Sequence, residues 1–150
     1  MGDNNNNATP LSNSEYKKVG AAVYDRVCDY PNLPANAVVD YQALNGVGHL
    51  GVMSVPGGKY RKRYITGGFE AEYPFQILYK TSPTENSLSF NAESLIDDLA
   101  DWLESRPYPT LTDDRVVERI SMDSTTYTST ADNDGSVVYV RSGVVTYEKV

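Results

Sequence analysis

The feature that most restricts the fold of this chain is an alternation of apolar and polar side chains between Phe69 and Tyr79. A period of two places successive side chains on opposite faces of a β-strand, so the segment is predicted to form a half-buried strand. Pro74 has no N–H to donate to a neighbouring strand, and it therefore predicts an edge strand or a bulge at that point. The apolar face is predicted to hold Phe69, Ala71, Tyr73, Phe75, Ile77 and Tyr79.

Two Gly-Gly pairs precede this strand and predict its neighbours. If Gly67-Gly68 forms a two-residue hairpin turn, Arg63 lies opposite Glu72 on the outer face. A second turn at Gly57-Gly58 adds a shorter strand near residues 50–55. The segment is therefore predicted to be a three-stranded antiparallel meander.

A helix is predicted over residues 12–29, before the meander. Ser12 and Glu15 match the S-x-x-E capping box, in which each side chain bonds the backbone amide of the other residue. Pro31 ends the helix. Its apolar face consists of Tyr16, Val19, Val23, Val27 and Tyr30. After it, residues 37–44 fit either a short strand or a turn of helix.

A second helix is predicted to have Asn91 as its N-cap and to stop before Pro107. Its apolar stripe consists of Leu95, Ile96, Leu99, Trp102 and Leu103. Its solvated side carries Asp97, Asp98 and Asp101. A surface helix of a globular domain has this division into two sides.

The C-terminal part is again rich in predicted strands. Residues 116–122 and 136–140 are predicted strands, joined by a loop with a turn at Asp134-Gly135. Gly143 predicts a bulge, after which the strand continues over residues 144–150. The whole pattern predicts an α+β fold in which two helices flank a mainly antiparallel sheet, made of the meander and a C-terminal hairpin.

The first residues differ in composition from the rest of the chain. Residues 1–11 are polar and rich in asparagine, and they are predicted to form a flexible arm. Residues 12–150 are predicted to form a single domain, because this length supports one hydrophobic core.

Residues 46–51, GVGHLG, match the G-x-G-x-x-G pattern of dinucleotide-binding turns. Such a site requires a helix that begins at the third glycine, because the helix N-terminus binds the pyrophosphate. Here Gly51 is followed by VMSVPGG, in which Pro56 and two glycines prevent a helix of useful length. The match is therefore interpreted as a glycine-rich loop that leads into a strand.

The other reactive side chains match no known pattern of a catalytic or metal-binding site. Cys28 is the single cysteine, which excludes an internal disulfide, and it is predicted to be a small buried residue. His49, the single histidine, is predicted to be a loop side chain with its hydrogen bonds satisfied. A calcium loop aligned on Gly135 fails, because Thr130 and Arg141 stand where carboxylates are needed. We therefore expect no enzymatic activity, no cofactor and no metal.

Charge and tyrosine content restrict the partners. The formal net charge is −7 and there are 12 tyrosines. The charge disfavours a general nucleic-acid binder, and tyrosine suits half-buried sheets and wet protein interfaces. The basic run KYRKR at 59–63 allows three interpretations, in order of preference: pairing of Arg63 with Glu72, contact with an acidic neighbour, and contact with DNA. With no apolar leader and no run of membrane-spanning length, we expect a cytosolic or virion protein.

Three phrases together resemble the minor capsid or tail-completion proteins of tailed bacteriophages. They are VPGGKYRKRYITGGFEAEYPFQILYK, SLIDDLADWLES and DGSVVYVRSGVVTYEK, and the resemblance extends over about residues 12–150. It implies a tail terminator, which forms a ring, commonly hexameric, at the head-proximal end of the tail tube. The ring stops tube polymerisation and joins the tail to the neck. An acidic inner wall would repel DNA phosphates and let the genome pass.

The resemblance implies several partners: further copies of the chain, the tail tube protein and a neck protein, in a virion assembled in the host cytoplasm. The candidate interface residues are the basic Lys59, Arg61 and Lys62, the edge residues Tyr73, Pro74 and Phe75, and the loop residues Asp132, Asn133, Asp134 and Gly135. Two alternatives remain open at this point. One is another neck or head-completion component, and the other, less favoured, is a small ligand-binding α+β domain.

Overall fold

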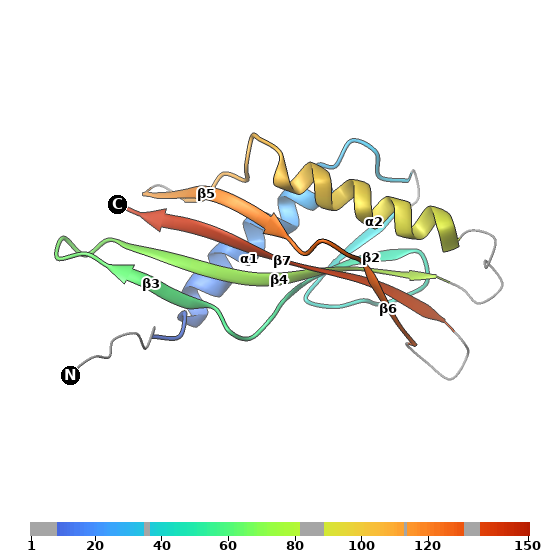
Figure 1. Cartoon of the computed structure of the whole chain (residues 1–150), viewed down its shortest axis with the longest axis horizontal. Coiled ribbons are helices and arrows are strands. Elements are labelled where there is room, and N and C mark those ends of the chain that lie inside the picture. Colours follow the sequence, from blue (N-terminus) through green and yellow to red (C-terminus); the bar gives the residue numbers. More distant parts are fainter. Residues whose placement is uncertain (1–8, 35–36, 82–88, 113, 131–135) are drawn as a thin grey trace.

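The protein has two layers, a seven-stranded sheet and two helices that pack on one face of it (Figure 1). The structure is a computed structural model, and it describes residues 9–34, 37–81, 89–112, 114–130 and 136–150. The predicted fold class, α+β with two helices and a mainly antiparallel sheet, is confirmed. Residues 1–8 of the predicted arm lie outside the described residues.

The helices are α1 (Asn13–Cys28) and α2 (Ser89–Glu104). The strands are β1 (Val38–Tyr41), β2 (His49–Ser54), β3 (Lys59–Arg63), β4 (Phe69–Thr81), β5 (Arg115–Met122), β6 (Tyr127–Thr130) and β7 (Val137–Lys149). Their order in the sheet is β1-β2-β4-β7-β5, with β3 also paired to β4 and β6 also paired to β7. Among these pairings only β1 with β2 is parallel. Of the two alternatives for residues 37–44, the structure therefore has the short strand.

The long strands β4 and β7 form the centre of the sheet and are paired along their whole length. The predicted alternation in β4 is confirmed, because its apolar face is buried from Phe69 to Ile77 and Tyr79 is half-buried. Both helices pack on this face, and Val23 of α1 and Leu99 of α2 belong to the same core cluster as β4. In Figure 1, α1 passes behind β4 and β7.

The prediction of an edge or a bulge in β4 at Pro74 is wrong, because the pairing of β4 with β7 runs without a register shift through Pro74 and β4 is inside the sheet. One side of β4 pairs with β7, and the other side pairs with β3 at residues 69–72 and with β2 at residues 75–79. Pro74 lies in the gap between these two partners, and its carbonyl accepts a hydrogen bond from Val55 N at 3.1 Å. The missing N–H of a proline points to the same side as its carbonyl, so Pro74 is tolerated in a central strand because the neighbouring strand is interrupted there.

The predicted meander is also wrong, because β2 and β3 do not pair with each other but follow one another along the same side of β4. The predicted two-residue turn at Gly67-Gly68 is replaced by a five-residue loop, since Arg63 lies opposite Phe69 rather than Glu72. Gly67 has a φ of 97°. Gly68 is required for a different reason, because a Cβ there would collide with the carbonyl oxygen of Lys149. Gly67 therefore belongs to a turn, in which its N–H donates to the Tyr64 carbonyl at 3.0 Å, whereas Gly68 marks a close contact between chain segments.

The C-terminal strand β7 is continuous through Gly143, so the predicted bulge is wrong. Gly143 lies opposite Phe75 of β4 on one side and Met122 of β5 on the other. A Cβ there would collide with the sulfur of Met122 and approach the Phe75 ring. The glycine thus makes room for two side chains in the core, and it does not interrupt the strand. The short strand β6 was not predicted, because its sequence YTST carries no large apolar side chain except Tyr127.

Both helices are confirmed, but their capping differs from the prediction. Ser12 is the N-cap of α1, and its hydroxyl accepts a hydrogen bond from Glu15 N at 3.3 Å. The reciprocal half of the capping box is absent, because Ser12 N donates to the hydroxyl of Tyr60 at 3.4 Å instead. Helix α2 begins at Ser89, so Asn91 lies in its first turn and is not the N-cap.

Candidate functional site

Basic side chains cover the exposed strand β3, in which every residue except Tyr60 is lysine or arginine. Arg61 lies 3.7 Å from Glu70 and 3.6 Å from Glu72, and Lys59 lies 3.8 Å from Glu72. These distances are too long for hydrogen bonds. The cations are also largely exposed to water, so each pair contributes little to stability.

The predicted pairing of Arg63 with Glu72 is wrong, and Lys59 and Arg61 lie near the glutamates of β4 instead. Because the register places Arg63 opposite Phe69, its guanidinium lies over the Tyr60 ring, 4.0 Å from the ring centre. Lys62 is exposed and makes no ion pair with any described residue. The strand β3 therefore presents cations to solvent that its own neighbours hold only loosely.

The second group of predicted interface residues lies inside the molecule. Tyr73 and Phe75 are 0% exposed, and Pro74 between them is half-buried in the central strand. The Tyr73 hydroxyl lies 2.5 Å from the Ser54 hydroxyl, and burial raises the pKa of Tyr73 to about 12. These residues belong to the core, and their predicted exposure on an edge is wrong. The third group, Asp132, Asn133, Asp134 and Gly135, lies outside the described residues.

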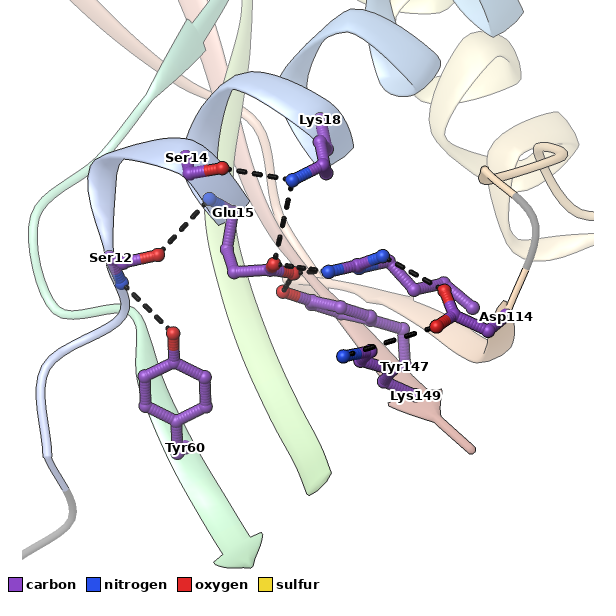
Figure 2. Close-up of polar contacts among 9 residues, drawn as sticks. Ser12, Ser14, Glu15, Lys18, Tyr60, Asp114, Tyr147 and Lys149 are labelled. Carbon is purple, nitrogen blue, oxygen red and sulfur yellow. Dashed lines mark hydrogen bonds and ion pairs between the residues drawn. The ribbon is translucent and has the colours of Figure 1, made fainter. Parts of the chain in front are cut away.

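A buried polar cluster, which the sequence did not reveal, joins the start of α1 to β5 and β7 (Figure 2). The Glu15 carboxylate accepts hydrogen bonds from Arg115 Nη2 at 2.6 Å and Nε at 3.0 Å, and from the Tyr147 hydroxyl at 2.8 Å. Two parallel bonds from one guanidinium are the strongest arrangement of such a pair. The S-x-x-E pattern assigned Glu15 to capping, so its real role had no signal in the sequence.

The electrostatics of this cluster keep it in one ionisation state at neutral pH. Burial acts to raise the pKa of Glu15, but the hydrogen bonds from Arg115 and Tyr147 outweigh it, so that pKa is lowered. Burial and the hydrogen bond to Glu15 raise the pKa of Tyr147. The cluster is therefore an ion pair with a neutral phenol, and its polar atoms are directed at one another. This arrangement ties three elements together and leaves no nucleophile or base free for chemistry.

A second polar cluster ties α2 to the other end of β7. Arg141, which is 8% exposed, donates to the Asp123 carbonyl at 2.7 Å and to Asp97 Oδ1 at 2.9 Å. The Thr126 hydroxyl donates to the same Asp97 oxygen at 2.6 Å. Asp97 is thus a structural residue as well as part of the acidic side of α2.

The segment GVGHLG, residues 46–51, contains the end of the connection between the parallel strands β1 and β2 and the first three residues of β2. His49 Nδ1 lies 2.8 Å from Asp40 Oδ2, and the same oxygen accepts a hydrogen bond from Asn45 N at 2.7 Å. Burial acts to raise the pKa of Asp40, but these two partners outweigh it, so that pKa is lowered. The prediction that His49 has a hydrogen-bond partner is confirmed, but its predicted place in a loop is wrong, because His49 is the first residue of β2.

The glycines of this segment are explained by packing. Gly51 lies within β2, and a Cβ there would stand 2.6 Å from the Ala43 carbonyl oxygen. Gly48 has a φ of 80°, which favours glycine. The prediction that a strand follows the loop is confirmed, and the helix N-terminus needed for a pyrophosphate is replaced by that strand.

Cys28 is exposed at the end of α1, so the prediction that it is buried is wrong. Cys28 follows Val27, whose side chain is buried, so Cys28 lies beside the buried face of α1 rather than on it. Partial desolvation and the nearby carboxylates of Asp25 and Asp29 raise the pKa of its thiol, although a hydrogen bond with Tyr24 opposes this. A raised pKa makes the thiol a poor nucleophile at neutral pH.

The two margins of the sheet are unlike each other. The first, here called the β1–β3 margin, lies on the side of β4 that faces away from β7, and it consists of the basic strand β3 and of β1, which exposes Val38 (47%) and Tyr41 (39%). The second, here called the β5–α2 margin, exposes Val116 (59%) on β5 and Tyr127 (50%) on β6, with α2 packed beside β5. No described strand pairs with the outer side of β1, β5 or β6, and residues 9–11 hydrogen-bond to the start of β3.

Two open grooves lie near these margins. One, of 830 Å³, lies between the start of α1 and the β2–β3 connection, with Tyr16, Val55 and Pro56 in its wall. The other, of 590 Å³, follows β5, with Tyr108 and Leu111 in its wall. Among the described residues no group of three or more histidine, cysteine or carboxylate side chains is arranged to hold a metal ion.

Neither a protein-family model nor a curated protein sequence matches the chain. Within the described part of the chain, no helix has the length and apolar character to cross a membrane. The functional conclusion therefore depends on the surfaces described above.

Proposed function

We propose that this protein is a structural subunit of a tailed bacteriophage, which forms a ring at the head-proximal end of the tail tube, terminates tube polymerisation and joins the tail to the neck. The proposal combines the resemblance of residues 12–150 to tail-completion proteins with the surfaces of the folded chain. Its immediate partners are further copies of the chain, the tail tube protein and a neck protein.

The observation that carries the proposal is the difference between the two margins of the sheet. Each margin exposes large apolar side chains, Val38 and Tyr41 on one and Val116 and Tyr127 on the other, at strand edges that invite pairing or packing. Because the two surfaces are unlike, an association that joins one to the other is head-to-tail. Repeated head-to-tail contacts generate a ring when the rotation closes.

The charge of the chain supports the same role. With a net charge of −7, a ring of such subunits repels the DNA that passes through it, so the genome moves without adhering. The polar clusters around Glu15 and Arg141 serve the fold and hold their groups in internal hydrogen bonds. A structural subunit needs these two clusters only to stabilise its fold.

The test is assembly of the purified full chain. We expect native mass spectrometry and multi-angle light scattering to give a closed oligomer, either alone or after addition of tail tubes, and negative-stain images to show rings on one tube end. Addition of the chain to polymerising tube protein should also stop tube growth. A monomer that leaves tube growth unchanged at every concentration contradicts the proposal.

One observation favours a different function, a small ligand-binding domain. The 830 Å³ groove beside Tyr16, Val55 and Pro56 is of a size that holds a small molecule. Isothermal titration calorimetry against nucleotides and small aromatic compounds tests this alternative. Stoichiometric binding by a monomer would favour it over the ring. A head-completion component of the neck is less favoured, because the sheet differs from the helical bundle expected there.

A further inference from the structure

The helix α2 carries negative charge that its own chain does not neutralise. Its sequence, SFNAESLIDDLADWLE, contains no lysine or arginine. Asp97 is paired with Arg141, but Glu93, Asp98 and Asp101 are exposed and make no ion pair with any described residue. Asp97 and Asp101 stand at i,i+4, and like charges at this spacing repel.

The position of Asp101 and Glu104 adds to this cost. Both lie in the last turn of α2, which contains no basic residue. The C-terminal end of a helix carries a partial negative charge, so carboxylates there are unfavourable and cations are favoured. The end of α2 is therefore a place where an external cation would stabilise the protein.

The chain has a matching surface on its other margin. In β3, the contacts of Lys59 and Arg61 with glutamates are loose, at 3.6 to 3.8 Å, and Lys62 is exposed without an ion pair to any described residue. In Figure 1, β3 and α2 lie at opposite ends of the molecule. One copy of the chain cannot bring its own β3 to its own α2, whereas two copies can.

We propose that the exposed lysine and arginine side chains of β3 in one copy bind the exposed carboxylates of α2 in the next copy. This inference rests on the proposed ring and names the contact by which its subunits recognise each other. The contact joins the β1–β3 margin to the β5–α2 margin, so it fixes the head-to-tail order. Complementary charge also gives a partner preference and a fast encounter at low salt.

The experiment reverses the charge on each side separately. In the full chain, Lys59→Glu, Lys62→Glu and Arg63→Glu together change the formal charge of β3 from +4 to −2. Glu93→Lys, Asp98→Lys and Asp101→Lys together change the formal charge of α2 from −5 to +1. Each triple variant should raise the subunit concentration needed for half-assembly, measured by light scattering, about tenfold or more, because like charges then face each other across the contact. All six positions are exposed, so circular dichroism should show folded protein.

Mixing the two triple variants provides the decisive test. Each variant alone presents like charges on both margins, whereas an equimolar mixture alternates acidic and basic surfaces and should assemble again as the wild type does. Arg106→Glu and Asp25→Lys serve as matched controls, because each reverses one exposed charge outside β3 and α2 and should leave assembly unchanged.

The outcomes separate this inference from the proposed function. If the wild type assembles and both triple variants assemble equally well, the ring stands and the β3–α2 contact is wrong. If the wild type stays monomeric with and without tail tubes, the proposed function fails and the contact fails with it. If fluorescent duplex DNA binds the wild type and is released by the β3 variant, with assembly unchanged, β3 contacts DNA and the inference is overturned.

Discussion

Two sets of ion pairs in this protein show what burial does to charge. The pair between Glu15 and Arg115 has two hydrogen bonds of 2.6 and 3.0 Å and joins residues that are 100 positions apart. The pairs between β3 and β4, around Arg61 and Glu72, are 3.6 Å or longer and open to water. The first set stabilises the fold, and the second leaves its charges available for another molecule. A charged side chain that is held in a short, buried ion pair is therefore not available to another molecule, whereas one in a long, exposed ion pair is.

The largest expected difference between the two regions comes from the same substitution in each. Glu15→Gln leaves the largely buried Arg115 with only the exposed Asp114 as a counter-charge, and removal of one partner of a buried pair costs about 3 kcal/mol or more. Glu72→Gln, the matched control on β4, should cost less than about 1 kcal/mol because its partners are exposed. Urea unfolding at pH 7, followed by tryptophan fluorescence, measures both. Equal losses of unfolding free energy in the two variants would show that the buried ion pair is no more stabilising than the exposed ones.

A second comparison concerns tyrosine hydroxyls that bind a carboxylate. Tyr147→Phe removes a buried hydroxyl that donates to Glu15 at 2.8 Å, and the loss should be about 1.5–3 kcal/mol because the acceptor is charged. Tyr64→Phe removes an exposed hydroxyl that donates to Glu148 at 3.1 Å, and should cost less than about 0.5 kcal/mol. Thermal unfolding of both variants gives the comparison. A larger effect at Tyr64 would show that burial is not the deciding factor.

Acid should weaken the buried cluster through Glu15 and the β1–β2 loop through Asp40, whose pKa values are both lowered by their hydrogen-bond partners. A carboxyl with a lowered folded-state pKa contributes stability that is present above its unfolded pKa and is lost as the pH falls through the folded value. Unfolding free energy should therefore hold from neutral pH to about pH 5 and decline below about pH 4. Urea midpoints from pH 7 to pH 3 measure this, and Glu15→Gln should show a smaller decline than the wild type.

The smallest expected effect has the opposite sign. Glu118 shares a hydrogen bond with Glu70 and lies near Glu148, so the pKa of Glu118 is raised. A carboxyl with a raised folded-state pKa lowers stability above that value, and the penalty disappears below the unfolded pKa. Glu118→Gln should thus stabilise the protein by about 0.2–1 kcal/mol at pH 7 and have no effect near pH 3. A destabilised variant at pH 7 would show that these carboxylates do not repel.

Sequence patterns predicted a helix or strand well wherever the pattern depends on that element alone. The alternation around β4 and the apolar faces of both helices follow from local periodicity, and the core contains the side chains that these patterns selected. Local periodicity reports which side of an element is apolar, because the apolar side must leave water wherever the partner lies. It carries no information about which element is that partner.

Several of the errors concern the partners of an element. Pro74 indicated an edge, but β2 and β3 follow each other along β4 and leave a gap that accommodates the proline. The S-x-x-E pattern assigned Glu15 to its own helix, whereas Arg115 and Tyr147 are the groups that bind it. Gly68 and Gly143 indicated a turn and a bulge, but each makes room for a distant part of the chain. Such contacts depend on residues far away in the sequence, which no local pattern includes.

The sequence by itself therefore determined the two layers of this protein, since periodicity and composition decide which surfaces avoid water. It also determined the concentration of positive charge in residues 59–63 and of negative charge in residues 89–104. Only the tertiary structure decided that Glu15 and Arg115 meet inside the molecule while β3 and α2 lie on opposite margins. The reason is that opposite charges attract each other whatever their separation in the sequence. The packing of the core decides which of them can approach each other.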